Sequence, residues 1–163
     1  MSTEGMMQRI NAILKHNTFK EYMQKNADSE KDRQLCKHDI IHALDVARIA
    51  HIINLEEGHG FSKELIYAAA LLHDITKWKQ YLQNICHAKS AITPAAQILK
   101  DCGFYNDEID LICHAIMHHR KNTEADVPFS NMLFRADKLS RLCQSCISFD
   151  ECNLIEKNTL LSY

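Results

Sequence analysis

The sequence has little glycine and proline, with four glycines and two prolines in 163 residues. This scarcity argues against a turn-rich all-β fold and favours helices. No apolar run approaches the roughly 20 residues that a membrane-spanning helix needs, and the first ten residues lack the apolar segment of a secretory signal. The net charge of −2 provides no basic surplus to grip the backbone of a nucleic-acid duplex.

Histidine and cysteine, in contrast, are plentiful, with ten and seven residues respectively. Since no secretory signal is seen, we expect a cytoplasmic protein whose cysteines stay reduced. The hydrophobic share of 46% and the charged share of 25% are typical of a globular chain, and the length suits a single core. We find no repeat, low-complexity tract or linker, so we treat the chain as one unit.

The spacing of apolar residues predicts an all-α domain, a single bundle of about six or more helices. Ser62 is the expected N-cap of one helix, Thr93-Pro94 the expected start of another, and Gly103 its C-cap. The polar segment 26–31 is expected to separate the first helix from the rest. The expected helices span about residues 6–24, 37–55, 62–72, 93–103, 106–119 and 130–142.

The strongest local feature is a His–Asp doublet, His73-Asp74, at the end of an apolar helix. A buried aspartate next to a histidine is costly unless its charge is paired, and a divalent metal ion is the obvious partner. Upstream, His42 lies on the inner face of its helix, and downstream Asp137 lies within an amphipathic helix. Nitrogen and oxygen ligands from three helices suit Fe, Mn, Zn, Co or Ni.

This pattern resembles the HD-domain superfamily of metal-dependent phosphohydrolases, in particular its small bacterial single-domain type. The resemblance covers about Arg33 to Arg141, and its motifs occur in the order His42-x-x-x-Val46-Ala47, Leu72-His73-Asp74-Ile75-x-Lys77 and Ala136-Asp137-Lys138. We therefore divide the chain into an N-terminal helix (1–25), an HD-type metal-binding core (33–142) and a cysteine-containing tail packed on the same domain (143–163). The metal ligands that the resemblance implies are His42, His73, Asp74 and Asp137.

Additional histidines resemble the dinuclear branch of the family, in which two extra histidines hold a second ion and Asp74 would bridge the pair. His87 fits the first of these positions, and the second has three candidates: His114, His118 and His119. At 100° per residue, His119 lies about 70° from the centre of the apolar face of its helix, and His118 lies nearly opposite that face. We choose His119 on this ground. Whether one or two ions bind per chain remains open.

The resemblance implies hydrolysis of a nucleotide or related small phosphate ester by a metal-activated water, with Asp74 holding the water's geometry. Lys77, one turn past the doublet, and Arg120, next to His119, would bind substrate phosphates. Dinucleoside polyphosphates, nucleoside monophosphates and cyclic nucleotides remain as alternative substrates. A non-catalytic regulator that binds nucleotide or metal on the same scaffold is the alternative function, and a redox activity of a di-iron pair is a third.

The cysteines near the C-terminus raise a separate hypothesis. Cys143-x-x-Cys146 and Cys152 are close in sequence, and Cys36 precedes the His42 helix. If the tail packs back on that helix, the four thiols could bind a structural zinc or an iron–sulfur cluster. Ordinary reduced cysteines are the favoured alternative. For His38, four residues before His42, a solvated or supporting role is favoured over metal ligation.

Overall fold

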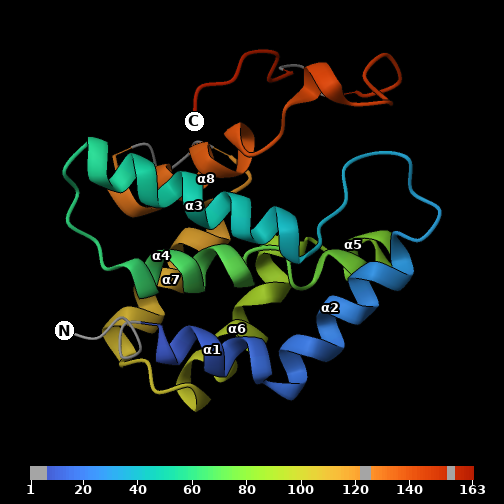
Figure 1. The fold of residues 1–163 in the computed structure, drawn as a ribbon. Helices are drawn as coiled ribbons and strands as arrows, with labels where there is room; N and C mark the ends of the chain where they lie inside the picture. Colours follow the sequence, from blue (N-terminus) through green and yellow to red (C-terminus); the bar gives the residue numbers. More distant parts are fainter. Residues whose placement is uncertain (1–6, 122–125, 154–156) are drawn as a thin grey trace.

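The computed structural model describes residues 7–121, 126–153 and 157–163, and every regular element within them is a helix (Figure 1). The all-α fold expected from the sequence is therefore confirmed. None of the described helices is long and apolar enough to cross a membrane. The elements are α1 (Gln8–Lys15), α2 (Asn17–Ser29), α3 (Ile40–Glu56), α4 (Lys63–Leu72), α5 (Lys77–Gln83), α6 (His87–Asp101), α7 (Asn106–His118), α8 (Pro128–Leu139) and the 3-10 turn η2 (Cys143–Ser145).

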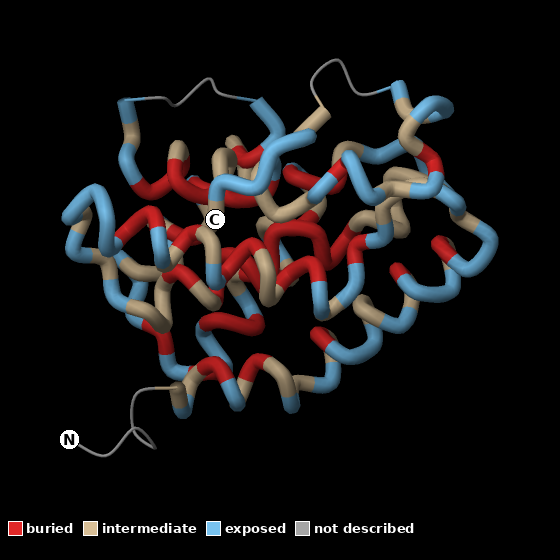
Figure 2. Tube along the Cα trace, turned by 45° about the horizontal axis from the view of Figure 1, so that its top comes forward, coloured by how far each residue is buried: buried red, intermediate tan, exposed pale blue. Residues whose placement is uncertain are grey.

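Helix α4 occupies the middle of the bundle, where it packs against α1, α3, α6, α7 and α8. Six of its ten residues are buried, and they belong to one hydrophobic cluster that runs from Ile10 to Ala136. Figure 2 shows these buried segments in the interior, surrounded by exposed outer turns. The small side chains of Ala68, Ala69 and Ala70 let neighbouring helices approach α4 closely. The C-terminal end of α4 therefore lies deep inside the protein.

Several helix ends follow the chemistry that the sequence predicts. The Ser62 hydroxyl accepts a hydrogen bond from the Leu65 N–H at 3.3 Å and caps α4. Gly103 has a φ of +82°, the left-handed conformation that ends α6. Its N–H and that of Phe104 donate to carbonyl groups of the last turn of α6 at 3.1 and 3.0 Å, the pattern of a Schellman cap.

The N-terminal region differs from the prediction of one helix followed by a polar separator. Helix α1 ends at Lys15, and His16 is the N-cap of a new helix, α2. The backbone of His16 is extended, and its ring Nδ1 accepts a hydrogen bond from the Thr18 N–H. Helix α2 then continues through Ser29, so segment 26–31 is not a solvated separator. Asn26, near the end of α2, is buried, and its side-chain amide forms hydrogen bonds with the two backbone groups described below.

The predicted helix start at Thr93-Pro94 is also wrong, because α6 begins at His87 and runs through Pro94. An interior proline removes one backbone hydrogen bond and costs about 3 kcal/mol. The fully buried residues on either side, Ala91 and Ala95, pack in the core and offset this cost. The short helix α5 was not predicted at all, since none of its seven residues is buried and it has no apolar stripe to detect.

Candidate metal centre

The six residues proposed as metal ligands from the sequence come from five helices that converge on one buried point. Each is at most 8% exposed. They are His42 in the first turn of α3, His73 and Asp74 at the end of α4, His87 at the start of α6, His119 at the end of α7, and Asp137 near the end of α8.

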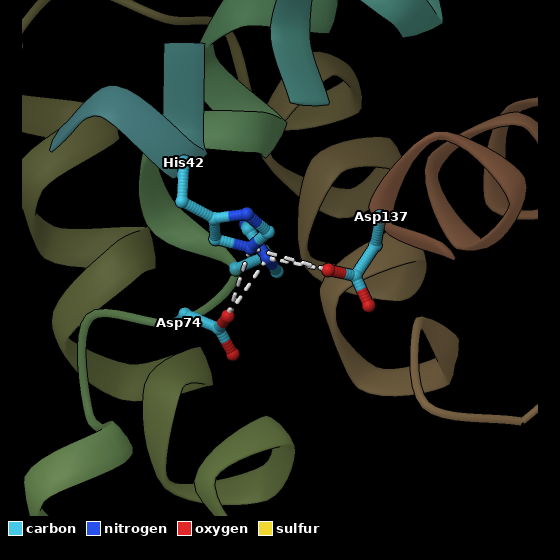
Figure 3. A group of neighbouring side chains, drawn as sticks. His42, Asp74 and Asp137 are labelled. Carbon is cyan, nitrogen blue, oxygen red and sulfur yellow. Dashed lines mark ion pairs between the residues drawn. The ribbon is translucent and has the colours of Figure 1, made fainter. Parts of the chain in front are cut away.

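The first group consists of His42, His73, Asp74 and Asp137, whose ligand atoms all lie within 4.8 Å of one another. Figure 3 shows how His42 faces the two carboxylates: its Nε2 lies 3.2 Å from Asp137 Oδ1 and 3.6 Å from Asp74 Oδ2. His73 Nε2 lies 3.0 Å from Asp74 Oδ2. Two imidazole nitrogens and two carboxylate oxygens form a donor set suited to a divalent transition metal.

The second group shares Asp74 with the first and adds His87 and His119, again with all ligand atoms within 4.8 Å. The Nε2 atoms of these histidines lie 3.0 and 3.6 Å from Asp74 Oδ1. Asp74 thus presents Oδ2 to one group and Oδ1 to the other. His114 and His118, the other candidates, lie against each other with ring centroids 4.6 Å apart and ring planes tilted by 37°, and they belong to neither group.

Backbone carbonyl groups fix the orientation of two of these imidazole rings. The Nδ1 atoms of His73 and His119 contact the carbonyl oxygens of Ala70 and Ile116 at 2.7 and 2.6 Å. Carbonyl groups in the last turn of a helix lack intrahelical partners, so they are free to accept from Nδ1–H. Each ring therefore turns Nε2 toward the carboxylates, which is how ligating histidines are commonly held.

The centre contains buried polar atoms that the described residues do not satisfy. Asp74 Oδ1 and His73 Nε2 are buried without a hydrogen-bond partner, because their close contacts have ion-pair distances but not hydrogen-bond geometry. Burial would raise the pKa of the Asp74 carboxyl, but the charge of His73 and contacts with His119 and His42 hold it well below its usual value. An ionised, incompletely paired carboxylate at this depth fits a divalent cation.

Metal binding should release a proton from this centre. Burial lowers the pKa of His73, but Asp74 and Asp137 outweigh it and raise that pKa to about 10. In metal-free protein at neutral pH, His73 is therefore protonated and must lose its proton to become a ligand. We expect release of about one proton per chain and an affinity that increases with pH up to about 10. Titration calorimetry in two buffers of different ionisation enthalpy measures this release, and heats independent of the buffer would contradict it.

Asn26 joins α2 to the turn that carries Asp74. Its Nδ2 donates to the Asp74 carbonyl oxygen at 2.9 Å, and its Oδ1 accepts from the Trp78 N–H at 2.9 Å. On the other side of the turn, the Thr76 hydroxyl donates to the His87 carbonyl oxygen at 2.8 Å. These bonds fix the connection between α4 and α5. No local pattern points to Asn26, because an asparagine in a polar segment is typically exposed.

Three cationic side chains lie at different depths around the centre. Burial lowers the pKa of Lys77, although the charges of Asp74 and Asp137 oppose this. Arg120 is exposed, and its Nη1 lies 3.5 Å from Cys86 Sγ. Arg141, which the sequence analysis did not single out, places its Nη2 3.1 Å from His42 Nε2. Only its position four residues after Asp137, just beyond the end of α8 at Leu139, could have drawn attention to it.

The structure does not bring together the four cysteines of the hypothetical zinc or iron–sulfur site, which the sequence analysis had ranked below ordinary reduced cysteines. All seven cysteines of the chain are free, and within the described residues no thiol belongs to a group of three or more converging ligand atoms. Cys36 instead interacts with the Arg141 side chain, and Cys143 is buried at the start of η2. A structural zinc at Cys36, Cys143, Cys146 and Cys152 therefore has no support from this geometry.

Residues 39–142, well over half of the chain, match the family model described as HD domain. The chain belongs to the HD domain family. An uncharacterized protein of Clostridium beijerinckii is 46% identical to this HD domain protein over 147 residues, which cover 90% of this chain and 92% of the relative. Among solved structures, a predicted HD superfamily hydrolase from an uncultured Thermotogales bacterium matches with a TM-score of 0.57 and 29% identity. The match covers 74% of this chain and 66% of that one.

Proposed function

We propose that this HD domain protein is a metal-dependent phosphohydrolase that acts on a nucleotide or a related small phosphate ester in the cytoplasm. The observation that carries the proposal is the position of Asp74 between two histidine-containing groups, one at each carboxylate oxygen. The similarity of this chain to a predicted HD superfamily hydrolase supports the same reaction class. The specific substrate and metal are part of the proposal.

His42, His73, Asp74 and Asp137 would hold one ion, and Asp74, His87 and His119 a second. When bound, a divalent ion of Fe, Mn, Zn, Ni or Co activates water and neutralises charge on the phosphoryl group. Asp74 would orient this centre because its two carboxylate oxygens face the two groups. Its backbone carbonyl is held by a hydrogen bond from the side-chain amide of Asn26 on α2.

The cationic side chains would bind the phosphate groups of the substrate. Lys77 is half-buried, lies within reach of the charges of Asp74 and Asp137, and can act as a point charge for one phosphate oxygen. Arg141 lies against His42 and can offer two parallel N–H donors. Arg120 is exposed at the rim, so it would contact a second phosphate farther from the reacting group. Lys77 and Arg120 would therefore bind the substrate and not the metal ion.

Hydrolysis assays on the protein loaded in turn with each of the five metals test the proposal. The substrates are a dinucleoside tetraphosphate, a nucleoside monophosphate and a cyclic nucleotide, with product followed by chromatography. We expect metal-dependent turnover of at least one of them. Nucleotide binding without turnover under every metal would favour the regulator, and oxygen consumption by an iron-loaded form would favour redox chemistry.

The second group predicts a specific change in metal stoichiometry. His87→Ala or His119→Ala should lower the content from about two ions per chain to about one, because the other four ligands remain. Elemental analysis by mass spectrometry measures the content. His114→Ala, an exposed histidine on α7, is the matched control and should keep both ions. A wild-type content of one ion, unchanged in both variants, would contradict the second site.

A further inference from the structure

A hydrogen-bonded trio of two buried residues, Glu30 and His38, and the half-buried Tyr81 lies beside the metal centre without belonging to either ligand group. Glu30 follows the last turn of α2 and is 2% exposed, and His38 lies in the loop before α3 and is 7% exposed. Tyr81 reaches them from α5. The three come from separate parts of the chain, so the fold has to assemble them.

The Glu30 carboxylate fixes both the backbone and the ring of His38. Its Oε2 accepts from the His38 backbone N–H at 2.8 Å, and its Oε1 contacts the ring Nδ1 at 2.5 Å. The Tyr81 hydroxyl donates to the same Oε1 at 2.8 Å. An ionised carboxylate can only accept hydrogen bonds, so Nδ1 must carry the proton in this pair. Neutral His38 then presents a lone pair at Nε2.

The free nitrogen of His38 faces the first ligand group. Its Nε2 lies 3.9 Å from Asp74 Oδ2, which is too long for a direct hydrogen bond. The ring packs edge-on against that of His42, with centroids 5.7 Å apart. His38 is thus close to the ligands, but it is not one of the residues whose donor atoms converge there.

A lone-pair acceptor in this place discriminates between the two reactants of a hydrolysis. Oxygens of an ionised phosphate are acceptors and find their donors in Lys77 and Arg141, whereas a bare imidazole nitrogen would repel them. Water is the reactant that carries protons to donate. Its attack also requires alignment with the phosphorus, because displacement at phosphorus is roughly in line.

We propose that Glu30 and Tyr81 hold His38 so that its Nε2 accepts a hydrogen bond from the attacking water and aligns it for reaction. His38 is then a catalytic residue, and Glu30 and Tyr81 are positioning residues. The inference rests on the proposed hydrolase function. It adds three residues, none of which is a metal ligand or a phosphate-binding group, to the reaction.

Three variants test the trio, in order from the most to the least disruptive substitution: His38→Ala, Glu30→Gln and Tyr81→Phe. We expect His38→Ala to lower kcat by about 10²-fold, the typical cost of misplacing a reactant, with KM and metal content unchanged. In Glu30→Gln the amide can donate to Nδ1 and so move the ring proton to Nε2, which turns the acceptor into a donor. Tyr81→Phe loses one hydrogen bond to Glu30 and should lower kcat only several-fold.

Long-range ¹H–¹⁵N spectra of the metal-free protein give a readout that is independent of activity. The wild type should show His38 with its proton on Nδ1, and Glu30→Gln should show it on Nε2. His59→Ala, a histidine remote from the trio that pairs with Glu57, is the control and should leave kcat unchanged. Thermal unfolding identifies any variant that does not fold, in which case Tyr81→Phe still tests the trio.

The outcomes separate this inference from the proposed function. An active wild type whose His38→Ala variant keeps full kcat would overturn the inference alone. Loss of a metal ion in His38→Ala would also overturn it, because His38 would then be a ligand. A wild-type ring proton on Nε2 would overturn the role of Glu30. If the wild type hydrolyses no phosphate ester with any metal, the proposed function fails and the role of His38 fails with it.

Discussion

Asp74→Asn is expected to remove both metal ions and to lower kcat by about 10³-fold or more. Asp74 is the one residue common to the two ligand groups, with Oδ2 facing the first and Oδ1 the second. Asparagine keeps the shape but replaces one oxygen with an NH₂ group, which cannot ligate a cation and carries no charge. Mass spectrometry for metal content and the hydrolysis assay for kcat measure the two effects.

A matched control is Asp107→Asn, an exposed aspartate in the first turn of α7. This variant should retain its metal and its turnover, so general loss of negative charge is excluded as the cause. Circular dichroism should show helical content like that of the wild type in both variants. An Asp74→Asn protein that still holds two ions per chain would contradict the bridging arrangement.

Asn26→Ala is expected to lower the free energy of unfolding by about 2–6 kcal/mol. The substitution leaves two backbone groups, the buried Asp74 carbonyl and the partly buried Trp78 N–H, without their side-chain partner. Each buried unsatisfied polar group costs about 1–3 kcal/mol, and the missing side chain adds a small cavity. Urea unfolding of the metal-free protein measures the loss without a contribution from bound ions. Looser support of Asp74 should also weaken metal binding.

Asn11→Ala, at an exposed position of α1, is the control for this effect. Surface substitutions away from special features change stability by about 0.5 kcal/mol or less. If Asn26→Ala were equally mild, a water molecule or a backbone shift would have to satisfy both groups, and Asn26 would not be needed to hold the turn.

The side chains that converge at the candidate metal centre could be picked out from the sequence because their signals are local. His73 and Asp74 end an apolar run, and the helical period separates His119 from its neighbour His118. Each of these patterns can be recognised from the residues of a single helix. Recognising the family then linked the helices in the right order, which periodicity alone does not do.

The supporting residues could not be predicted in this way, because their partners are remote in sequence. Asn26 contacts a residue 48 positions away, and Tyr81 contacts Glu30 across 51 positions. Glutamate and asparagine in polar segments are typically exposed, so only the packing of α2 against α5 gives them a role. The start of α6 was predicted wrongly for a similar reason. The rule that proline occupies the first position of a helix was overridden at Pro94 by burial of the residues around it.

The convergence of candidate ligands from five helices has a consequence for the lifetime of the protein. An ion bound here cross-links segments that are far apart in the chain, so it binds the folded state and not the unfolded one. At a free metal concentration of 100 times Kd, this linkage adds about 2.7 kcal/mol of stability. When metal is scarce, a larger fraction of molecules opens and is exposed to proteases. The abundance of the protein in a cell should therefore follow the supply of its metal.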